Sequence, residues 1–355
     1  MNTNAVQKMI RVLVVDDSAT VRSVICRELK ADSEIDVVGF ARDGIEALEK
    51  IAELKPDVVT LDIEMPRMNG LQALERLMEQ SPTKVIMVSS LTRAGADATL
   101  DALDLGAFDF VAKPSSMGSA GLMTVVAELI EKVKHAGRSR VVPRPMGARA
   151  LRVTLSTSAV RWRRGVVVIG SSTGGPQALR AVVEQLPADL GVPVLAVQHM
   201  PPGFTRALAE RLDKLCAIHV EEARPGTRIA AGKVVLAPGG FHMKLRLNGE
   251  IELNEAPTEC GVRPAVNVTM ESVVGLYGGE TLGVVLTGMG HDGTRGGKLI
   301  KAAGGHMIVE AESTCVVYGM PRSIVEAGLA DQVVPLDRVG AAIVDMCKDK
   351  MRASA

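Results

Sequence analysis

The sequence predicts two α/β domains in succession, each built around a mostly parallel sheet. Three observations support this. At 355 residues the chain is too long for one typical domain. Short apolar runs alternate with segments of helical spacing in both halves, as in strands joined by crossover helices. Hydrophobic residues make up 47% of the chain but aromatic residues only 2%, which suits aliphatic strands buried on both faces.

The first half contains five apolar runs that we expect to be strands. The segments between them have helical spacing: Val21, Val24 and Leu29, for example, share one helical face. This alternation favours a flavodoxin-like, doubly wound (βα)5 sheet of order 2-1-3-4-5, with strands one, three and five side by side. The expected strands are 10–15, 37–41, 58–61, 85–88 and 108–112.

Residues 137–164 break the alternation, so we expect domains at 1–136 and 165–350 with a linker between them. The linker contains eight arginines and no acidic residue. A solvated linker is the simplest interpretation, and a basic tether for an acidic partner is the alternative. Trp162, the only tryptophan, could pack at a domain interface.

The second half resumes the alternation of strands and helices. One segment differs: residues 245–253 alternate about Asn248-Gly249, a strong signal for an antiparallel hairpin. We therefore expect a Rossmann-like, mostly parallel α/β domain that carries this hairpin. Its parallel strands are expected at 166–169, 194–198, 234–237, 282–286 and 307–309.

Composition excludes several classes of function. Lys plus Arg and Asp plus Glu are both 41, so no net charge attracts nucleic acid. No apolar run approaches the roughly 18 residues of a membrane span, which argues against direct membrane insertion. The N-terminus lacks a signal-peptide core, and five scattered cysteines without a CxxC pair indicate reduced thiols. We expect a cytoplasmic protein.

Chemically active side chains follow four of the five strands expected in the first half. Asp16 and Asp17 follow the first strand, Asp62 the third, Ser89 the fourth and Lys113 the fifth. Three carboxylates in one crevice repel one another unless a cation lies among them, and oxygen ligands suit Mg²⁺. A carboxylate beside Mg²⁺, a lysine and a hydroxyl can accept a phosphoryl group. The Asp pair alone could be only a helix cap.

These motifs resemble the receiver domain of two-component response regulators. The resemblance implies that Asp62 is the phosphoacceptor and that Asp16 and Asp17 help it to hold Mg²⁺. It also implies that Ser89 is the switch hydroxyl and that Lys113 contacts the phosphate. The segments that carry the resemblance are LVVDDS (13–18), LDIEMPRMNG (61–70) and VAKP (111–114).

The second half opens on a strand followed by GSSTGG (170–175). The loop lacks the lysine of a Walker A motif and the spacing of a dinucleotide fingerprint. It matches G-x-S-x-G, the spacing of a nucleophile elbow, with Ser172 as the candidate nucleophile. On this motif alone Ser172 could be only a helix N-cap.

A serine nucleophile needs a base and an orienting acid. His199 follows the next expected strand, and Asp292 follows a later one, so both belong to the same rim as Ser172. Position alone does not decide the base, because three other histidines lie near strand or loop ends: His242, His291 and His306. The chain order Ser, His, Asp differs from that of α/β-hydrolases.

The second half is similar, nearly end to end, to the catalytic domain of the chemotaxis protein-glutamate methylesterase, which is also a protein-glutamine glutaminase. The resemblance implies that Ser172 is the nucleophile, His199 the base and Asp292 its orienting partner. Thr173, Gly174 and Met289 are the oxyanion and substrate candidates. The matching segments are GSSTGG (170–175), QHMPPGF (198–204), LAPG (236–239), LTGMG (286–290) with Asp292-Gly293, and VYGMP (317–321).

The same resemblance implies the partners and the reaction. A receptor glutamate methyl ester would lose methanol, and a receptor glutamine would lose ammonia, with no cofactor for hydrolysis. The substrates would be the cytoplasmic helices of methyl-accepting chemoreceptors, and a chemotaxis histidine kinase would donate the phosphoryl group. His291 varies in the family, and here its ring could tune Asp292.

Two rival functions for the second half remain open at this point. One is a response regulator with a non-catalytic output, such as nucleic-acid binding, although the sequence has no helix-turn-helix signal. The other is a nucleotide-binding domain built on the glycine loop.

Overall fold

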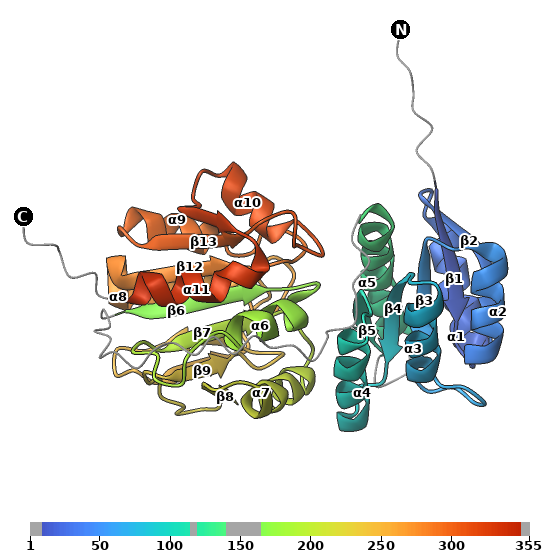
Figure 1. Ribbon diagram of the computed structural model, residues 1–355, viewed down its shortest axis with the longest axis horizontal. Coiled ribbons are helices and arrows are strands. Elements are labelled where there is room, and N and C mark those ends of the chain that lie inside the picture. The colour runs from blue at the N-terminus through green and yellow to red at the C-terminus, as the bar shows by residue number, and fades with distance from the viewer. Residues whose placement is uncertain (1–8, 114–118, 140–164, 349–355) are drawn as a thin grey trace, which may run out of the picture. The chain divides into compact units, whose positions relative to one another are not determined.

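The computed structural model describes residues 9–113, 119–139 and 165–348, and the chain divides into two compact units, 1–147 and 148–355 (Figure 1). Apart from its first three residues, the predicted linker, with Trp162, lies outside the described residues. Residues 137 and 138 belong to the last helix of the first unit, and Gly137 packs closely on Ile10.

The first unit is a five-stranded parallel sheet in the order β2-β1-β3-β4-β5, which confirms the predicted fold. One detail of the prediction is wrong. Strands one, three and five do not all lie side by side, because β4 separates β3 from β5. In chain order the elements are β1 (Ile10–Val15), α1 (Ala19–Ala31), β2 (Ile35–Ala41), α2 (Gly44–Leu54), β3 (Val58–Asp62), α3 (Gly70–Gln80), β4 (Lys84–Ser89), α4 (Arg93–Asp104), β5 (Asp109–Ala112) and α5 (Ser119–Arg138).

Side-chain caps begin the helices that follow the functional strand ends. Ser18 caps α1, and Asn69 forms a capping box with Gln72 at the start of α3. Thr92 caps α4 by accepting the Gly95 N–H at 3.0 Å. Each cap fixes the residue at which its helix begins. The loop before the helix is therefore short, and its polar side chains lie at the carboxyl edge of the sheet.

The second unit is a seven-stranded parallel sheet in the order β14-β13-β12-β6-β7-β9-β8, with a separate antiparallel hairpin of β10 and β11. The predicted architecture is again confirmed. The elements are β6 (Val166–Ser171), α6 (Gly175–Val183), β7 (Val194–Gln198), α7 (Phe204–Leu215), β8 (His219–Glu222), β9 (Lys233–Leu236), β10 (His242–Leu245), β11 (Ile251–Asn254), α8 (Val266–Tyr277), η1 (Gly278–Glu280), β12 (Thr281–Val285), α9 (Thr294–Ala302), β13 (His306–Glu310), α10 (Met320–Glu326), β14 (Gln332–Val334) and α11 (Leu336–Cys347).

Two strands of this sheet do not follow from the sequence pattern. β8 and β14 have only three or four residues, are partly exposed and form the two edges of the sheet. Edge strands need little apolar surface, so neither produces the apolar run by which the central strands are recognised.

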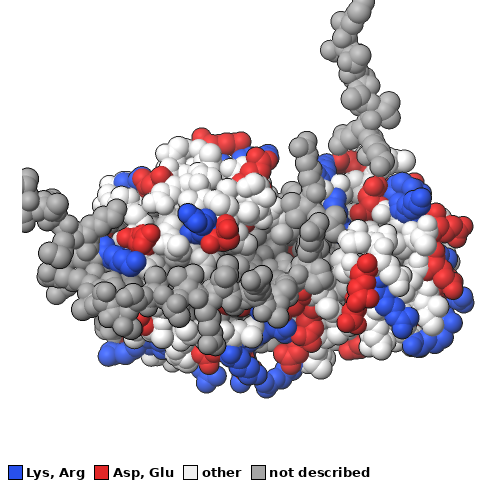
Figure 2. Space-filling model, in the orientation of Figure 1, with Lys and Arg blue, Asp and Glu red and all other residues white. Residues whose placement is uncertain are grey.

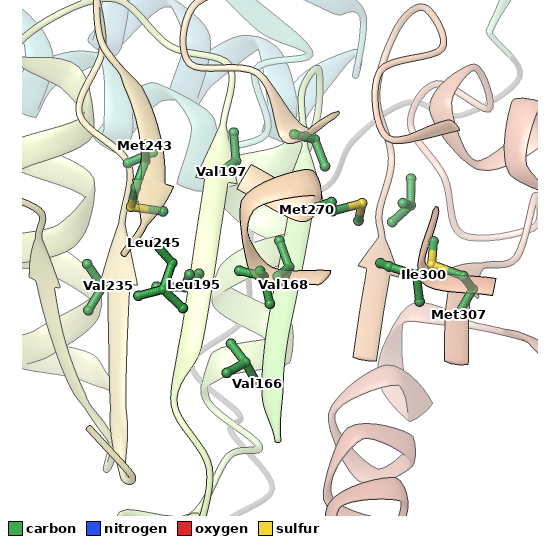
Figure 3. Packing of buried hydrophobic residues seen from close by; sticks show 14 of the residues in the cluster. Val166, Val168, Leu195, Val197, Val235, Met243, Leu245, Met270, Ile300 and Met307 are labelled. Carbon is green, nitrogen blue, oxygen red and sulfur yellow. The ribbon is translucent and has the colours of Figure 1, made fainter. Parts of the chain in front are cut away.

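An aliphatic core joins the sheet to α8 and to the hairpin. Figure 3 shows Val168 of β6 and Leu195 of β7 pointing to the side of the sheet on which Met270 of α8 and Met243 of β10 lie. All four side chains are fully buried. This core packs α8 against the central strands. The packing holds the N-terminus of α8 near the carboxyl edge of the sheet.

The surface agrees with the neutral composition. On the face shown in Figure 2, acidic and basic side chains are interspersed over each unit and do not gather into one patch of a single sign. Within the described ranges, no helix combines the length and the apolar composition that crossing a membrane requires.

Candidate active site

The carboxyl edge of the first sheet brings three acidic side chains and a lysine together. Ligand oxygens of Asp16, Asp17 and Asp62 all lie within 4.8 Å of one another. The Lys113 Nζ lies 2.6 Å from Asp62 Oδ2 and 3.2 Å from Asp16 Oδ2. The lysine therefore reaches Asp62 across the end of β4, although β5 and β3 are not neighbours.

This crevice fits a hard divalent cation. Burial raises the pKa of Asp62 to about 6, and the Lys113 ammonium offsets only part of that effect. Asp16 Oδ2 is buried, and the Lys113 ammonium lies 3.2 Å from it. Three carboxylates with oxygens this close to one another are the donor set that Mg²⁺ prefers.

The hydroxyl of Ser89 is bonded to the backbone of α4. It is fully buried at the end of β4 and donates to the Gly95 carbonyl oxygen at 3.0 Å. Its carbonyl oxygen accepts the Lys113 N–H at 2.6 Å, which ties β4 to the end of β5. To meet a group on Asp62, the Ser89 hydroxyl has to leave Gly95.

In the second unit, Ser172 lies on the sharp turn between β6 and α6. Its N–H donates to the Thr287 carbonyl at 3.0 Å, and its own carbonyl accepts Gly175 N–H at 2.7 Å and Gln198 Nε2 at 2.9 Å. Gly174 has a φ of 74°, a left-handed conformation that favours glycine. The Gln198 amide packs closely against Gly175, where an added Cβ would lie 2.0 Å from Gln198 Oε1.

The next strand places His199 beside this turn. β6 and β7 are paired up to Ser171 and Gln198, and the His199 N–H donates to the Ser171 carbonyl at 3.1 Å. The imidazole Nε2 lies 2.8 Å from Asp292 Oδ2. Because Nε2 is engaged by the acid, Nδ1 is the ring nitrogen that remains for another partner.

Asp292 is almost fully buried and is held by the first residues of α8. Its carboxylate accepts the Val266 N–H at 2.6 Å and the Asn267 N–H at 2.9 Å. Burial alone would raise the pKa of Asp292, but the hydrogen bond from His199 and these backbone donors outweigh it and hold that pKa below its usual value. The acid is therefore ionised at neutral pH.

Helices α8 and α9 cap each other around Asp292. Asp292 satisfies the first N–H groups of α8, and the Asn267 side chain accepts the N–H groups of Gly293 at 3.0 Å and Gly296 at 2.9 Å at the start of α9. Each helix thus supplies the acceptor that the other needs at its N-terminus. The position of the acid is fixed by two helices at once.

Two backbone N–H groups are suited to an oxyanion. Neither the Gly174 N–H nor the Met289 N–H donates to another group among residues 9–113, 119–139 and 165–348. Gly174 is buried and Met289 half-buried, beside the Ser172 turn and just after Thr287 respectively. Thr173 is buried, and its carbonyl lies 3.0 Å from the Thr287 hydroxyl.

The structure does not join Ser172 Oγ to the His199 ring. In the described part of the chain Ser172 Oγ makes no hydrogen bond, while the His199–Asp292 pair is already formed. Catalytic hydrogen bonds are often loose before substrate binds.

The other candidate histidines make no hydrogen bond to Asp292 among the described residues. His306 begins β13, at the end of the strand away from the site. His242 is buried and its Nε2 lies 3.0 Å from the Pro257 carbonyl oxygen. His291 is exposed, and its Nε2 lies 3.7 Å from Cys260 Sγ, with no hydrogen bond to Asp292 in the described chain.

Three residues that hold the site together do not follow from the sequence pattern: Gln198, Asn267 and Thr287. For Gln198 the sequence contains a signal, because a polar residue directly follows the apolar run 194–197. The structure shows that this polar residue is almost fully buried. Asn267 and Thr287 had no comparable pattern, since their roles depend on segments that meet only in the folded chain.

Comparison with known proteins bears on both halves of the chain. Residues 12–126 match the family of response regulator receiver domains, and residues 167–343 match the family described as CheB methylesterase. A protein-glutamate methylesterase/protein-glutamine glutaminase of Symbiobacterium thermophilum is 51% identical to this chain over 354 residues, which covers 96% of this chain and 98% of that protein. This chain belongs to the protein-glutamate methylesterase/protein-glutamine glutaminase family.

Further relatives agree with this assignment. The protein-glutamate methylesterase/protein-glutamine glutaminase of Thermotoga maritima is 45% identical over 344 residues, which covers 96% of this chain and 99% of that protein. The crystal structure of the Thermotoga maritima CheB methylesterase catalytic domain matches with a TM-score of 0.51 and 43% identity, and it covers 52% of this chain and 99% of that domain. The chain is thus a methylesterase/glutaminase with an N-terminal receiver domain, so two of the three functions considered for the second half no longer apply.

Proposed function

We propose that Ser172 is the nucleophile with which this methylesterase/glutaminase hydrolyses glutamate methyl esters and deamidates glutamines of chemoreceptors. The observation that carries the proposal is the His199–Asp292 pair at 2.8 Å, on the same strand edge as Ser172. An imidazole held by a buried carboxylate, on the strand edge that also carries a serine, is equipped to act as a general base.

The proposed reaction has two steps. His199 Nδ1 takes the proton of Ser172, and Ser172 Oγ attacks the ester carbonyl of a receptor glutamate. The N–H groups of Gly174 and Met289 stabilise the oxyanion, the imidazolium protonates the leaving methoxide, and methanol departs. A water molecule, deprotonated by His199, then releases the glutamate. A glutamine side chain follows the same route and releases ammonia.

We further propose that the receiver domain controls this reaction through Asp62. Asp16, Asp17 and Asp62 would hold Mg²⁺, and Lys113 would contact the phosphoryl group on Asp62. The bound ion would neutralise charge on the phosphoryl oxygens. The Ser89 hydroxyl, now on the Gly95 carbonyl, would turn toward the new negative charge and carry the change into α4.

The partners and location follow from the same proposal. The substrate would be the cytoplasmic helices of methyl-accepting chemoreceptors, and the phosphoryl donor a chemotaxis histidine kinase. The protein would act in the cytoplasm. We propose domain bounds of 1–136 and 165–350, joined by residues 137–164.

A fluorophosphonate probe tests the assignment of Ser172. The full chain is treated with the probe, digested and mapped by peptide mass spectrometry. We expect the label on Ser172, no label in Ser172→Ala, and slow labelling in His199→Ala. A label on any other serine, or equal labelling of His199→Ala and wild type, would contradict the proposed pair of nucleophile and base.

A further inference from the structure

A buried carboxyl group lies close behind the proposed active site without a catalytic role assigned to it. Glu310 is the last residue of β13 and has no exposed surface. Within the described residues no basic side chain pairs with it. Burying an unpaired carboxyl group is costly, so its presence in a core needs a compensating function.

The carboxyl group of Glu310 accepts two hydrogen bonds. Its Oε2 accepts the Thr287 N–H at 2.8 Å, and its Oε1 accepts the Thr314 hydroxyl at 3.0 Å. The ladder between β12 and β13 ends with the pair Val285 and Val309, so Thr287 lies beyond it. The buried Thr287 N–H therefore has no backbone acceptor on β13. The Glu310 carboxyl group supplies the acceptor in its place.

Thr287 in turn contacts Ser172 and Thr173, the first two residues of the turn after β6. Its carbonyl oxygen accepts the Ser172 N–H at 3.0 Å, and its hydroxyl lies 3.0 Å from the Thr173 carbonyl oxygen. The same hydroxyl accepts the Val317 N–H at 2.9 Å. A displacement of Thr287 is therefore passed directly to Ser172.

The residues after Thr287 face the nucleophile at close range. A Cβ placed on Gly288 would lie 2.7 Å from Ser172 Cβ and 2.5 Å from Met320 Sδ, so only glycine fits there. Met289, whose N–H is the second oxyanion candidate, follows immediately. The distance between nucleophile and oxyanion donor thus depends on where the segment 287–289 is held.

We propose that Glu310 is a positioning residue: it holds the Thr287 N–H and thereby sets the placement of Ser172 relative to the Met289 N–H. The inference rests on the proposed function, because it takes Ser172 as the nucleophile. Glu310 touches neither substrate nor reacting atoms. It acts through Thr287, and its contribution is to the alignment of the transition state.

The role requires an acceptor oxygen at the right distance and does not require a charge. Burial raises the pKa of Glu310, which favours the neutral carboxyl group. Both the neutral and the ionised group present an oxygen to the Thr287 N–H. Three substitutions at position 310 separate these properties. Glutamine keeps the oxygen and the length of the side chain, and methionine keeps the approximate volume without the oxygen. Aspartate keeps the carboxyl group but withdraws it by one methylene.

The test compares Glu310→Gln, Glu310→Met and Glu310→Asp in the full chain, with kcat and KM for methanol release from methylated receptor. We expect Glu310→Gln to retain kcat within about threefold and Glu310→Met to lose roughly 10- to 100-fold in kcat. KM should stay near the wild-type value in both variants, because the substrate surface is unchanged. The fluorophosphonate labelling rate of Ser172 should fall in parallel with kcat.

Thr281→Val is the matched control for a change in a buried polar residue of the same sheet. Thr281 is buried at the opposite end of β12, and its hydroxyl has no hydrogen-bond partner among the described residues. This variant should keep wild-type kcat. If Glu310→Met does not fold, the pair Glu310→Gln and Glu310→Asp decides: the proposal requires the glutamine variant to be active and the aspartate variant impaired.

Three results would overturn the inference: wild-type kcat in folded Glu310→Met, a loss confined to KM, or a glutamine variant as impaired as the methionine variant. These outcomes differ from a failure of the proposed function itself. If Ser172→Ala is inactive while folded Glu310→Met has normal kcat, only the positioning role is wrong. If Ser172→Ala remains active, the nucleophile assignment is wrong, and the inference is withdrawn with it.

Discussion

The imidazole Nε2 of His199 lies 2.8 Å from Oδ2 of Asp292, across 93 residues of sequence. The same carboxylate receives the first two N–H groups of α8. The orientation of His199, the proposed base, therefore depends on how α8 packs into the core as well as on Asp292 itself. A change at Asp292 should affect both the ring and the helix.

The first prediction concerns the relative weight of base and acid. His199→Ala should lower kcat by roughly 10⁴- to 10⁶-fold, because base and nucleophile act as a unit. Asp292→Ala should be less severe in kcat, since the acid orients and does not react, but it should also lower the thermal stability of the catalytic domain. Rates of methanol release and calorimetric Tm measure the two effects. If His291→Ala proves more damaging than His199→Ala, the assigned base is wrong.

A second prediction tests the packing behind the nucleophile turn. A Cβ at Gly175 would lie 2.0 Å from Gln198 Oε1, the side chain whose Nε2 binds the Ser172 carbonyl. Gly175→Ala should therefore displace Gln198 and lower kcat by at least about tenfold. Gly275→Ala in α8 is the control, because its Cβ meets nothing within 4 Å. Steady-state kinetics that show equal kcat for both variants would refute this account of the turn.

The third prediction concerns the stability of the receiver domain without Mg²⁺. Asp62 has a pKa of about 6 in the folded domain against an ordinary value of 3.8. A proton is therefore held more tightly in the folded state, so stability is greatest below about pH 4 and falls as the pH rises to about 6. Above that pH the buried carboxylate costs up to about 3 kcal/mol.

Asp62→Asn removes this cost. In EDTA at about pH 7.5 it should raise the free energy of unfolding by about 1–3 kcal/mol, and near pH 4 the gain should nearly vanish. Differential scanning calorimetry of the receiver transition measures both. Asp17→Asn, at an exposed carboxylate, is the matched control and should change Tm far less. An Asp62→Asn variant that is destabilised at neutral pH would show that burial does not penalise this carboxylate.

A fourth prediction concerns regulation. We expect the receiver domain to inhibit the catalytic domain until Asp62 is phosphorylated, with a coupling of roughly 1–3 kcal/mol that changes activity about 5- to 150-fold. A shortened chain that begins at Arg161 should be active without a phosphoryl donor. The Asp62→Asn full chain should stay at the basal rate with donor and Mg²⁺. If the shortened chain is no faster than the unphosphorylated full chain, simple occlusion of the site is wrong.

The fold could be predicted largely from the sequence because central parallel strands are buried on both faces and produce unmistakable apolar runs. The same logic located Ser172, His199 and Asp292, which follow such runs and share one sheet edge. It failed where a segment lies at an edge, as in β8 and β14, since three or four partly exposed residues leave no periodic signal.

The supporting residues could not be predicted for a different reason. Asn267 and Thr287 act through contacts with distant parts of the sequence: Asn267 binds Gly293, 26 positions away, and Thr287 binds Thr173, 114 positions away. No local spacing encodes such contacts. Glu310 was likewise indistinguishable from a solvated acidic residue at a strand end until its burial and its bond to Thr287 were known.

Methanol release from a receptor with methylated glutamates tests the central claim most directly, because it reports the chemistry assigned to Ser172. Wild type and Ser172→Ala are compared as full chains, each phosphorylated to the same extent and each checked for native Tm. We predict a loss of several orders of magnitude in Ser172→Ala with Tm unchanged. Release near the wild-type rate from the folded variant would contradict the assignment of Ser172 as the nucleophile.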